Sequence, residues 1–157
     1  AALPERRLSE VYESLRIRAE AHLAKTGKRP QVFSANMGPI PQHKPRADFS
    51  RGFFEAGGFE VIGNDGFETP EAAADAALES GAMVSVICST DDTYPDLVPR
   101  FIERLRAANP EAVVVLAGFP KGQVETHEKT GVDEFIHLRA NNLELLERLL
   151  AKAEVAS

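Results

Sequence analysis

One histidine stands where an α/β protein places its ligand-binding loop. His43 lies between Pro41 and Pro45, after the apolar run Val32–Ala35 and before a helix-like stretch at about 48–56. Ligands of open α/β sheets bind in loops that leave the carboxyl end of a strand. An imidazole there can coordinate a metal when an acceptor orients its other ring nitrogen. The alternative is a loop histidine that is exposed or hydrogen-bonded locally.

Other reactive side chains have no partners at a useful spacing. Cys88 ends an apolar run with no base nearby in the sequence, so we expect a buried thiol rather than a nucleophile. Asp91 and Asp92 could suggest a metal or phosphoacceptor site, but Asn36 follows the first strand where a receiver domain has acids. We expect Asp91 to be a turn or helix-capping residue. The remaining histidines are expected to be structural or solvated: His22, His127 and His137.

Composition excludes several classes of function. The chain has 157 residues, which predicts one domain with a proper core. Its formal net charge of −6 argues against a nucleic-acid partner. A single cysteine favours a reducing, cytoplasmic compartment, and no apolar run approaches the ~20 residues of a membrane span. The opening residues, AALPERRLSEV, lack the apolar core of a secretion signal and look like the cut edge of a longer chain.

Short apolar runs alternate with helix-like stretches along most of the chain. The two central runs, MVSVIC and AVVVLAG, are continuously apolar, as in strands that are buried on both faces. The alternation predicts a parallel sheet covered by helices on both sides. The expected strands are Val32–Ala35, Phe59–Gly63, Met83–Cys88, Val113–Ala117 and Glu134–His137. The expected helices lie at about Asp48–Ala56, Pro70–Ser80, Pro95–Ala108, Gly122–Thr130 and Asn141–Ala153.

A further helix is predicted before the first strand, from Pro4 to about Lys25. Apolar residues recur along it at steps of three and four, which places them on one stripe. The stripe consists of Leu8, Val11, Leu15, Ala19 and Leu23. We expect residues 1–28 to form this helix and a linker, and 29–157 to form the α/β domain. The helix is either a packing arm or a connection to another domain or subunit.

Four segments, in order and at matching spacing, resemble the cobalamin-binding domain of methylmalonyl-CoA mutase and its relatives. They are AGGFEVIG with ETPEAAADAALESGA, Leu97-Val98-Pro99, VVVLAGFP and TGVDEFIH, and the similarity runs from about residue 32 to 150. The resemblance implies a flavodoxin-like (Rossmann-like), doubly wound sheet of five parallel strands in the order 2-1-3-4-5, with an extra N-terminal helix.

Cobalamin-binding members of this family carry Asp-x-His-x-x-Gly after the first strand, where the histidine ligates cobalt and the aspartate orients it. The resemblance places His43 at the ligand position. Pro41 then stands where the family has aspartate, and Arg46 where it has glycine. Proline offers no side-chain acceptor to an imidazole, and arginine adds a long cation.

The other two signatures are Ser-x-Leu after the third strand and Gly-Gly after the fourth, whose small residues open a channel for the cofactor's nucleotide tail. In this chain Cys88 and Thr90 take the serine and leucine positions. Phe119 follows Gly118 at the second glycine, or lies just beyond the pair Ala117-Gly118 in a register one residue earlier. In either register the phenyl ring is expected in or beside the tail channel.

Three altered signatures around one ligand imply a degenerate cobalamin site without a cofactor of its own. This pattern resembles the small subunit of heterodimeric methylmalonyl-CoA mutases, whose catalytic large subunit holds adenosylcobalamin. The resemblance implies a supporting region of an isomerase complex that is not catalytic alone. Two alternatives stay open. One is a functional cobalamin carrier with His43 as lower cobalt ligand, and the other is an unrelated flavodoxin-like domain that binds a nucleotide or flavin.

Overall fold

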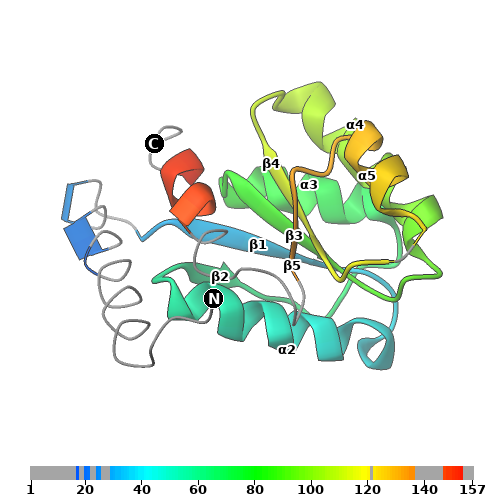
Figure 1. Cartoon of the computed structure of the whole chain (residues 1–157), viewed down its shortest axis with the longest axis horizontal. Coiled ribbons are helices and arrows are strands. Elements are labelled where there is room, and N and C mark those ends of the chain that lie inside the picture. The colour runs from blue at the N-terminus through cyan, green and yellow to red at the C-terminus, as the bar shows by residue number, and fades with distance from the viewer. Residues whose placement is uncertain are drawn as a thin grey trace, which may run out of the picture.

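The computed structural model describes residues 17, 20, 21, 24, 25, 29–120, 122–136 and 147–153. Five parallel strands form one sheet in the order β2-β1-β3-β4-β5, which confirms the predicted fold class (Figure 1). The strands are β1 (Gln31–Asn36), β2 (Glu60–Ile62), β3 (Val84–Cys88), β4 (Val113–Ala117) and β5 (Glu134–Ile136). The helices between them are α2 (Ile40–Ala56), α3 (Pro70–Ser80), α4 (Tyr94–Ala108) and α5 (Val124–Thr130), and residues 147–153 are also helical.

Two apolar cores lie on the two faces of the sheet. One packs α2 and the 147–153 helix against the sheet, and includes Phe54 and Leu149. The other packs α3 and α4 against the opposite face, and includes Ala74 and Phe101. Figure 1 shows α2 on one side of the sheet and α3, α4 and α5 on the other. Every residue of β3 and β4 is buried, as expected of strands covered on both faces.

Helix α3 begins and ends as its sequence predicts. The Thr69 hydroxyl accepts a hydrogen bond from the Ala72 amide at 3.2 Å, Pro70 is the first helical residue, and Glu71 lies in the first turn. Gly81 ends the helix with φ of +77°, in the left-handed region that glycine adopts without strain. These signals fix the ends of α3 locally, and the alanines between them pack on the sheet.

The prediction that a loop follows the first strand until a helix starts at about Asp48 is wrong, because α2 already begins at Ile40. Pro39 caps the helix in an extended conformation, and Pro41 falls in the first turn, where a proline removes no helical hydrogen bond. Pro45 lies deeper in the helix and does remove one, yet α2 continues because its inner face is anchored. The residues buried on that face are His43, Ser50, Phe53 and Phe54.

Several predicted features lie wholly or partly outside the described residues. These are most of the N-terminal helix, His22, His137 and the start of the last predicted helix. The last predicted helix is seen as helical from 147 to 153. Within the part of the chain that the structure describes, no helix is long and apolar enough to cross a membrane.

Candidate functional site

The carboxyl ends of β1, β3 and β4 meet beneath the first turns of α2, and the side chain of Arg46 lies over them. Its Nη1 atom donates a hydrogen bond to the Ser89 carbonyl at 3.0 Å and lies 2.6 Å from Oδ1 of Asp91. The guanidinium carbon lies 5.5 Å from the centre of the Tyr94 ring. Arg46 is about one-third exposed, so the cation covers the sheet edge while one side reaches solvent.

Gly118 provides the space that this guanidinium uses. A Cβ atom built at Gly118 would lie 2.9 Å from Nη1 of Arg46, closer than real Cβ atoms come to a neighbour. The φ of Gly118 is +129°, a conformation that other residues rarely adopt. The missing side chain of Gly118 thus makes room for the Arg46 guanidinium.

Tyr94 joins the ends of β3 and β4 below Arg46. Its buried hydroxyl accepts a hydrogen bond from the Ser89 amide at 3.0 Å and donates one to the Ala117 carbonyl at 2.7 Å. Burial, with a smaller effect of the nearby Cys88, raises the pKa of the Tyr94 hydroxyl far above its usual range. The hydroxyl therefore stays neutral and acts as a structural bridge.

His43 lies on α2 rather than in a loop, and its side chain is only 3% exposed. Its Nδ1 atom is 3.1 Å from the Gly38 carbonyl, and because a carbonyl only accepts, Nδ1 carries the hydrogen. A Cβ atom at Gly66 would lie 2.6 Å from Cε1 of His43, so the loop after β2 closes against the ring. The role of Gly38 cannot be predicted from the sequence, because a backbone acceptor is not specified by residue type.

The other predicted site residues surround this edge. Pro41 is exposed in the first turn of α2. The Thr90 carbonyl accepts a hydrogen bond from the Thr93 amide at 3.1 Å and so belongs to the turn before α4. Phe119 is 52% exposed, and its ring packs edge-on against Phe135 at 5.7 Å. Whether Phe119 also obstructs a cofactor channel stays a prediction, whereas Arg46 covers Gly118 directly.

Cys88 is the buried thiol that the sequence predicts. It is fully buried, with Sγ 3.6 Å from the Ser50 hydroxyl and 3.8 Å from the Ser34 hydroxyl. Burial raises the pKa of the Cys88 thiol to about 11, although these two hydrogen bonds act in the opposite direction. A thiol that is neutral and enclosed in this way is not a nucleophile.

The turn residue Asp91 is explained by its place in the 91–93 turn and by its ion pair with Arg46. His127 is buried on α5, with Nε2 2.9 Å from Oε1 of Gln123. Among the residues that the structure describes, no three histidine, cysteine or acidic side chains are grouped so that they could hold a metal ion. The carboxyl edge of the sheet is thus covered by a network of polar contacts, built mainly from Arg46, Ser89 and Tyr94.

No family model matches the chain. The chain is 36% identical over 154 residues to the methylmalonyl-CoA mutase small subunit of Streptomyces virginiae. The aligned region covers 98% of this chain and 24% of that protein. It is 35% identical over 135 residues to the methylmalonyl-CoA mutase small subunit of Porphyromonas gingivalis, covering 86% of this chain and 21% of that protein. The chain therefore spans about a quarter of the length of these relatives.

The fold has a close counterpart among solved structures. A cobalamin-binding protein from Desulfitobacterium hafniense superposes with a TM-score of 0.63, covering 90% of this chain and 70% of that one. The sequence identity is 18%, so this likeness shows the fold alone. The chain is thus similar in sequence to methylmalonyl-CoA mutase small subunits and similar in fold to a cobalamin-binding protein.

Proposed function

We propose that this chain is the cobalamin-binding-like domain of a methylmalonyl-CoA mutase small subunit, with a degenerate cofactor site. The proposal rests on the 36% identity that extends over 98% of the chain to such a subunit. In it, residues 29–157 form a non-catalytic domain that supports a catalytic large subunit in the cytoplasm. Adenosylcobalamin is then held by that partner rather than by this domain.

The observation that carries the degenerate site is the position of Arg46. Where cobalamin-binding members have glycine, its guanidinium lies over Gly118 and is held by Ser89 and Asp91. A nucleotide tail that entered between α2 and these strand ends would have to displace the cation and break both interactions. A ligand that displaced the Arg46 guanidinium would leave the Asp91 carboxylate without its partner. The free energy lost with that interaction opposes binding.

The burial of His43 supports the same conclusion. A cobalt ligand must present its free nitrogen to a cofactor outside the protein, but the His43 side chain is 3% exposed and Gly66 closes against it. The cavity beside it, between α2 and the loop after β2, has about 290 Å³. This volume is just below the ~300–1,000 Å³ of pockets that bind drug-sized ligands, and a corrinoid is larger than such ligands. The described residues do not fit the cofactor in this conformation.

A supporting role agrees with the chemistry of the edge. Cys88 is enclosed, Tyr94 stays neutral, and Arg46 is already paired. None of these three groups is available to transfer a proton or attack a substrate. The edge offers a hydrogen-bonded polar surface at the end of a five-stranded sheet, which suits a domain that supports a partner.

Titration with hydroxocobalamin tests the proposal directly. The visible spectrum of the cofactor is followed while the intact chain is added, with His43→Ala as the matched control. We expect the same spectrum with both proteins, because neither presents an imidazole to cobalt. Tight binding with a histidine-for-water spectral change that disappears in His43→Ala would refute the degenerate site.

One observation favours the alternative of a functional carrier that uses His43 as lower cobalt ligand. The Gly38 carbonyl supplies the acceptor that Pro41 cannot, and it leaves Nε2 of His43 as the nitrogen without a hydrogen. Such a carrier must open the first turn of α2 before it binds. The titration separates the two functions, because only the carrier gives a spectral change that depends on His43.

A further inference from the structure

The cavity of about 290 Å³ beside His43 lies between α2 and the loop that follows β2. Ile40, Ala47 and Val61 give it apolar walls, and His43 lines it from α2. All the residues that line this cavity fall within the described range 29–120. Because its volume is just below that of pockets for drug-sized ligands, the cavity suits a molecule smaller than those.

His43 brings one buried nitrogen without a partner to this cavity. Its Nδ1 atom donates to the Gly38 carbonyl at 3.1 Å, which leaves Nε2 as a hydrogen-bond acceptor. No residue that the structure describes makes a hydrogen bond to Nε2. His43 is 3% exposed, yet Nε2 is not one of the fully enclosed polar atoms, so its small accessible surface faces the cavity that His43 lines. An unpaired buried acceptor costs free energy, which a ligand with a hydrogen-bond donor would recover.

The two asparagines that line the cavity already have hydrogen-bond partners. Oδ1 of Asn36 accepts from the Ser34 hydroxyl at 2.7 Å, and its Nδ2 atom donates to the Asn64 carbonyl at 3.2 Å. Nδ2 of Asn64 donates to the Ser34 carbonyl at 2.8 Å, and its Oδ1 atom accepts the Gly66 amide at 3.0 Å. These bonds hold the loop after β2 against the end of β1, so the cavity is formed before any ligand enters.

The charges that line this cavity balance, which favours a neutral ligand. They are two cations and two carboxylates, on Lys44, Arg51, Asp48 and Asp65. Lys44 pairs with Asp48 at 3.0 Å, and Arg51 pairs along the helix with Glu55 at 3.3 Å. Asp65 is exposed, and no ion pair joins it to any residue that the structure describes. The two groups left to a ligand, the imidazole and the Asp65 carboxylate, both accept hydrogen bonds.

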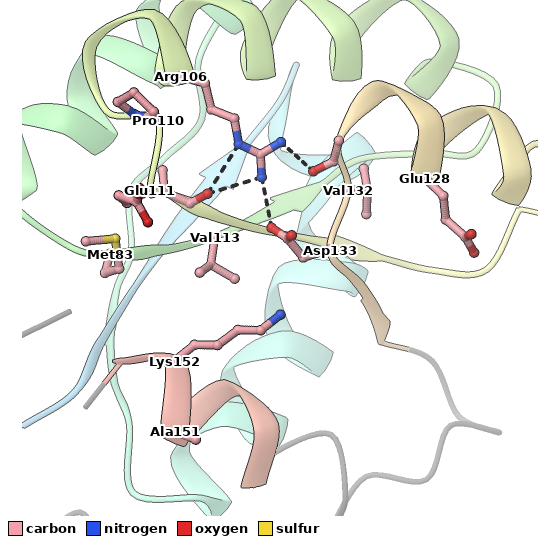
Figure 2. Close-up of a pocket in the computed structure, with 12 residues that line it drawn as sticks. Met83, Arg106, Pro110, Glu111, Val113, Glu128, Val132, Asp133, Ala151 and Lys152 are labelled. Carbon is pink, nitrogen blue, oxygen red and sulfur yellow. Dashed lines mark hydrogen bonds and ion pairs between the residues drawn. The ribbon is translucent and has the colours of Figure 1, made fainter. Parts of the chain in front are cut away.

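In a larger cavity of about 880 Å³ at the amino edge of the sheet, the central charged groups satisfy each other. Arg106 donates there to the carbonyls of Gly131 at 2.6 Å and Ala112 at 3.1 Å (Figure 2). It also pairs with Asp133 at 2.9 Å, and Asp133 accepts the Val114 amide at 2.8 Å. The unpaired acceptor of His43, rather than cavity size, therefore marks the ligand site.

We propose that the cavity beside His43 binds a small neutral polyol of the size and chemistry of a ribosyl group. One hydroxyl donates to Nε2 of His43 and another to the Asp65 carboxylate, while the carbon skeleton packs against Ile40 and Val61. The proposal rests on the degenerate cofactor site, because Nε2 cannot accept a hydrogen bond and ligate cobalt at the same time.

Nitrogen NMR of the intact chain tests this site. The resonance of His43 Nε2, identified by its absence in His43→Gln, is followed while adenosine or methyl β-D-ribofuranoside is added. We expect a saturable shift, because the acceptor nitrogen gains a hydrogen bond. Dideoxyadenosine, which lacks both ring hydroxyls of adenosine, should bind at least about fivefold more weakly. Equal affinity for adenosine and the riboside supports a free sugar as ligand, and tighter binding of adenosine supports a nucleoside.

Asp65→Ala tests the site without altering the buried imidazole. It should weaken adenosine binding about fivefold, through the loss of one hydrogen bond. Glu68→Ala, at an exposed acid of the same loop outside the cavity, should leave adenosine binding unchanged. The polyol site is overturned by an unmoved Nε2 resonance, by equal binding of dideoxyadenosine, or by binding that Asp65→Ala does not weaken. A spectral change of hydroxocobalamin that requires His43 would instead refute the proposed function, so the two failures are distinguishable.

Discussion

Replacing Arg46 with alanine removes three interactions at the carboxyl edge of the sheet. The charged hydrogen bond to the Ser89 carbonyl is worth about 1.5–3 kcal/mol when buried. The ion pair with Asp91, at side-chain exposures of 31% and 48%, adds only ~0.5–1 kcal/mol. The contact with the Tyr94 ring adds a similar ~0.5–1 kcal/mol. Water can reach this edge and replace part of the first two, so we expect a net loss of about 2 kcal/mol.

Urea unfolding of the intact chain measures this loss. With a slope of ~1–3 kcal/mol per molar, a loss of about 2 kcal/mol lowers the midpoint by about 1 M. Lys44→Ala is the matched control on the same helix, because its ion pair with Asp48 is 61% exposed on both sides. That substitution should change stability by less than ~0.5 kcal/mol.

The comparison of the two variants decides the role of Arg46. A loss for Arg46→Ala no larger than that of Lys44→Ala would refute the structural role given to the guanidinium. It would also remove the main support for a closed cofactor site. A loss of unfolding free energy near 2 kcal/mol, with an unchanged urea slope, would show that the Arg46 cation stabilises the fold. The unchanged slope would mean that the surface exposed on unfolding is the same in both proteins.

Three further variants or measurements test the surrounding structure. Tyr94→Phe should destabilise the domain by about 1–3 kcal/mol in urea unfolding, because the buried Ser89 amide and Ala117 carbonyl lose their partner; a loss under ~0.5 kcal/mol would contradict the bridge. Cys88 should not react with a thiol reagent at pH 8 unless the chain unfolds, since burial raises its pKa to about 11; rapid labelling of folded protein would contradict this. Burial lowers the pKa of His127 below 6.5 in the folded protein, so folding favours the neutral imidazole. The stability that this preference contributes is fully present above pH 6.5 and is lost as the pH falls below it. His127→Gln should flatten this pH dependence in thermal unfolding between pH 7 and pH 5, and an unchanged slope would show that another group is responsible.

The sequence predicts the strands of the sheet well because whole runs of apolar residues, rather than single residues, indicate them. Continuous apolar runs at β3 and β4 require burial on both faces, and the structure buries every residue of both. The start of α2 could not be predicted in the same way. Three prolines between residues 39 and 45 read as a loop, although the first two fall where a helix tolerates them. Helix α2 forms across this segment because Phe53 and Phe54 are buried in the core and anchor it.

The sequence names the candidate site residues, but it does not predict the contacts that they make. The resemblance alone singles out His43, Arg46 and Gly118 as candidates. The contact of the guanidinium with Gly118 depends on the rotation of α2 about its axis, and a segment predicted as a loop specifies no such rotation. The acceptor for His43 is the backbone of Gly38, and a side-chain pattern carries no information about it.

Pro45 divides α2 into two parts with different local stability. It has no amide hydrogen, so it cannot donate to the Pro41 carbonyl four residues earlier, and the first turn is joined to the helix by one hydrogen bond fewer. Segments joined in this way open at a free energy below that of global unfolding. The turn that carries His43 can therefore exchange its amide hydrogens through local fraying while Phe53, Phe54 and the sheet stay protected.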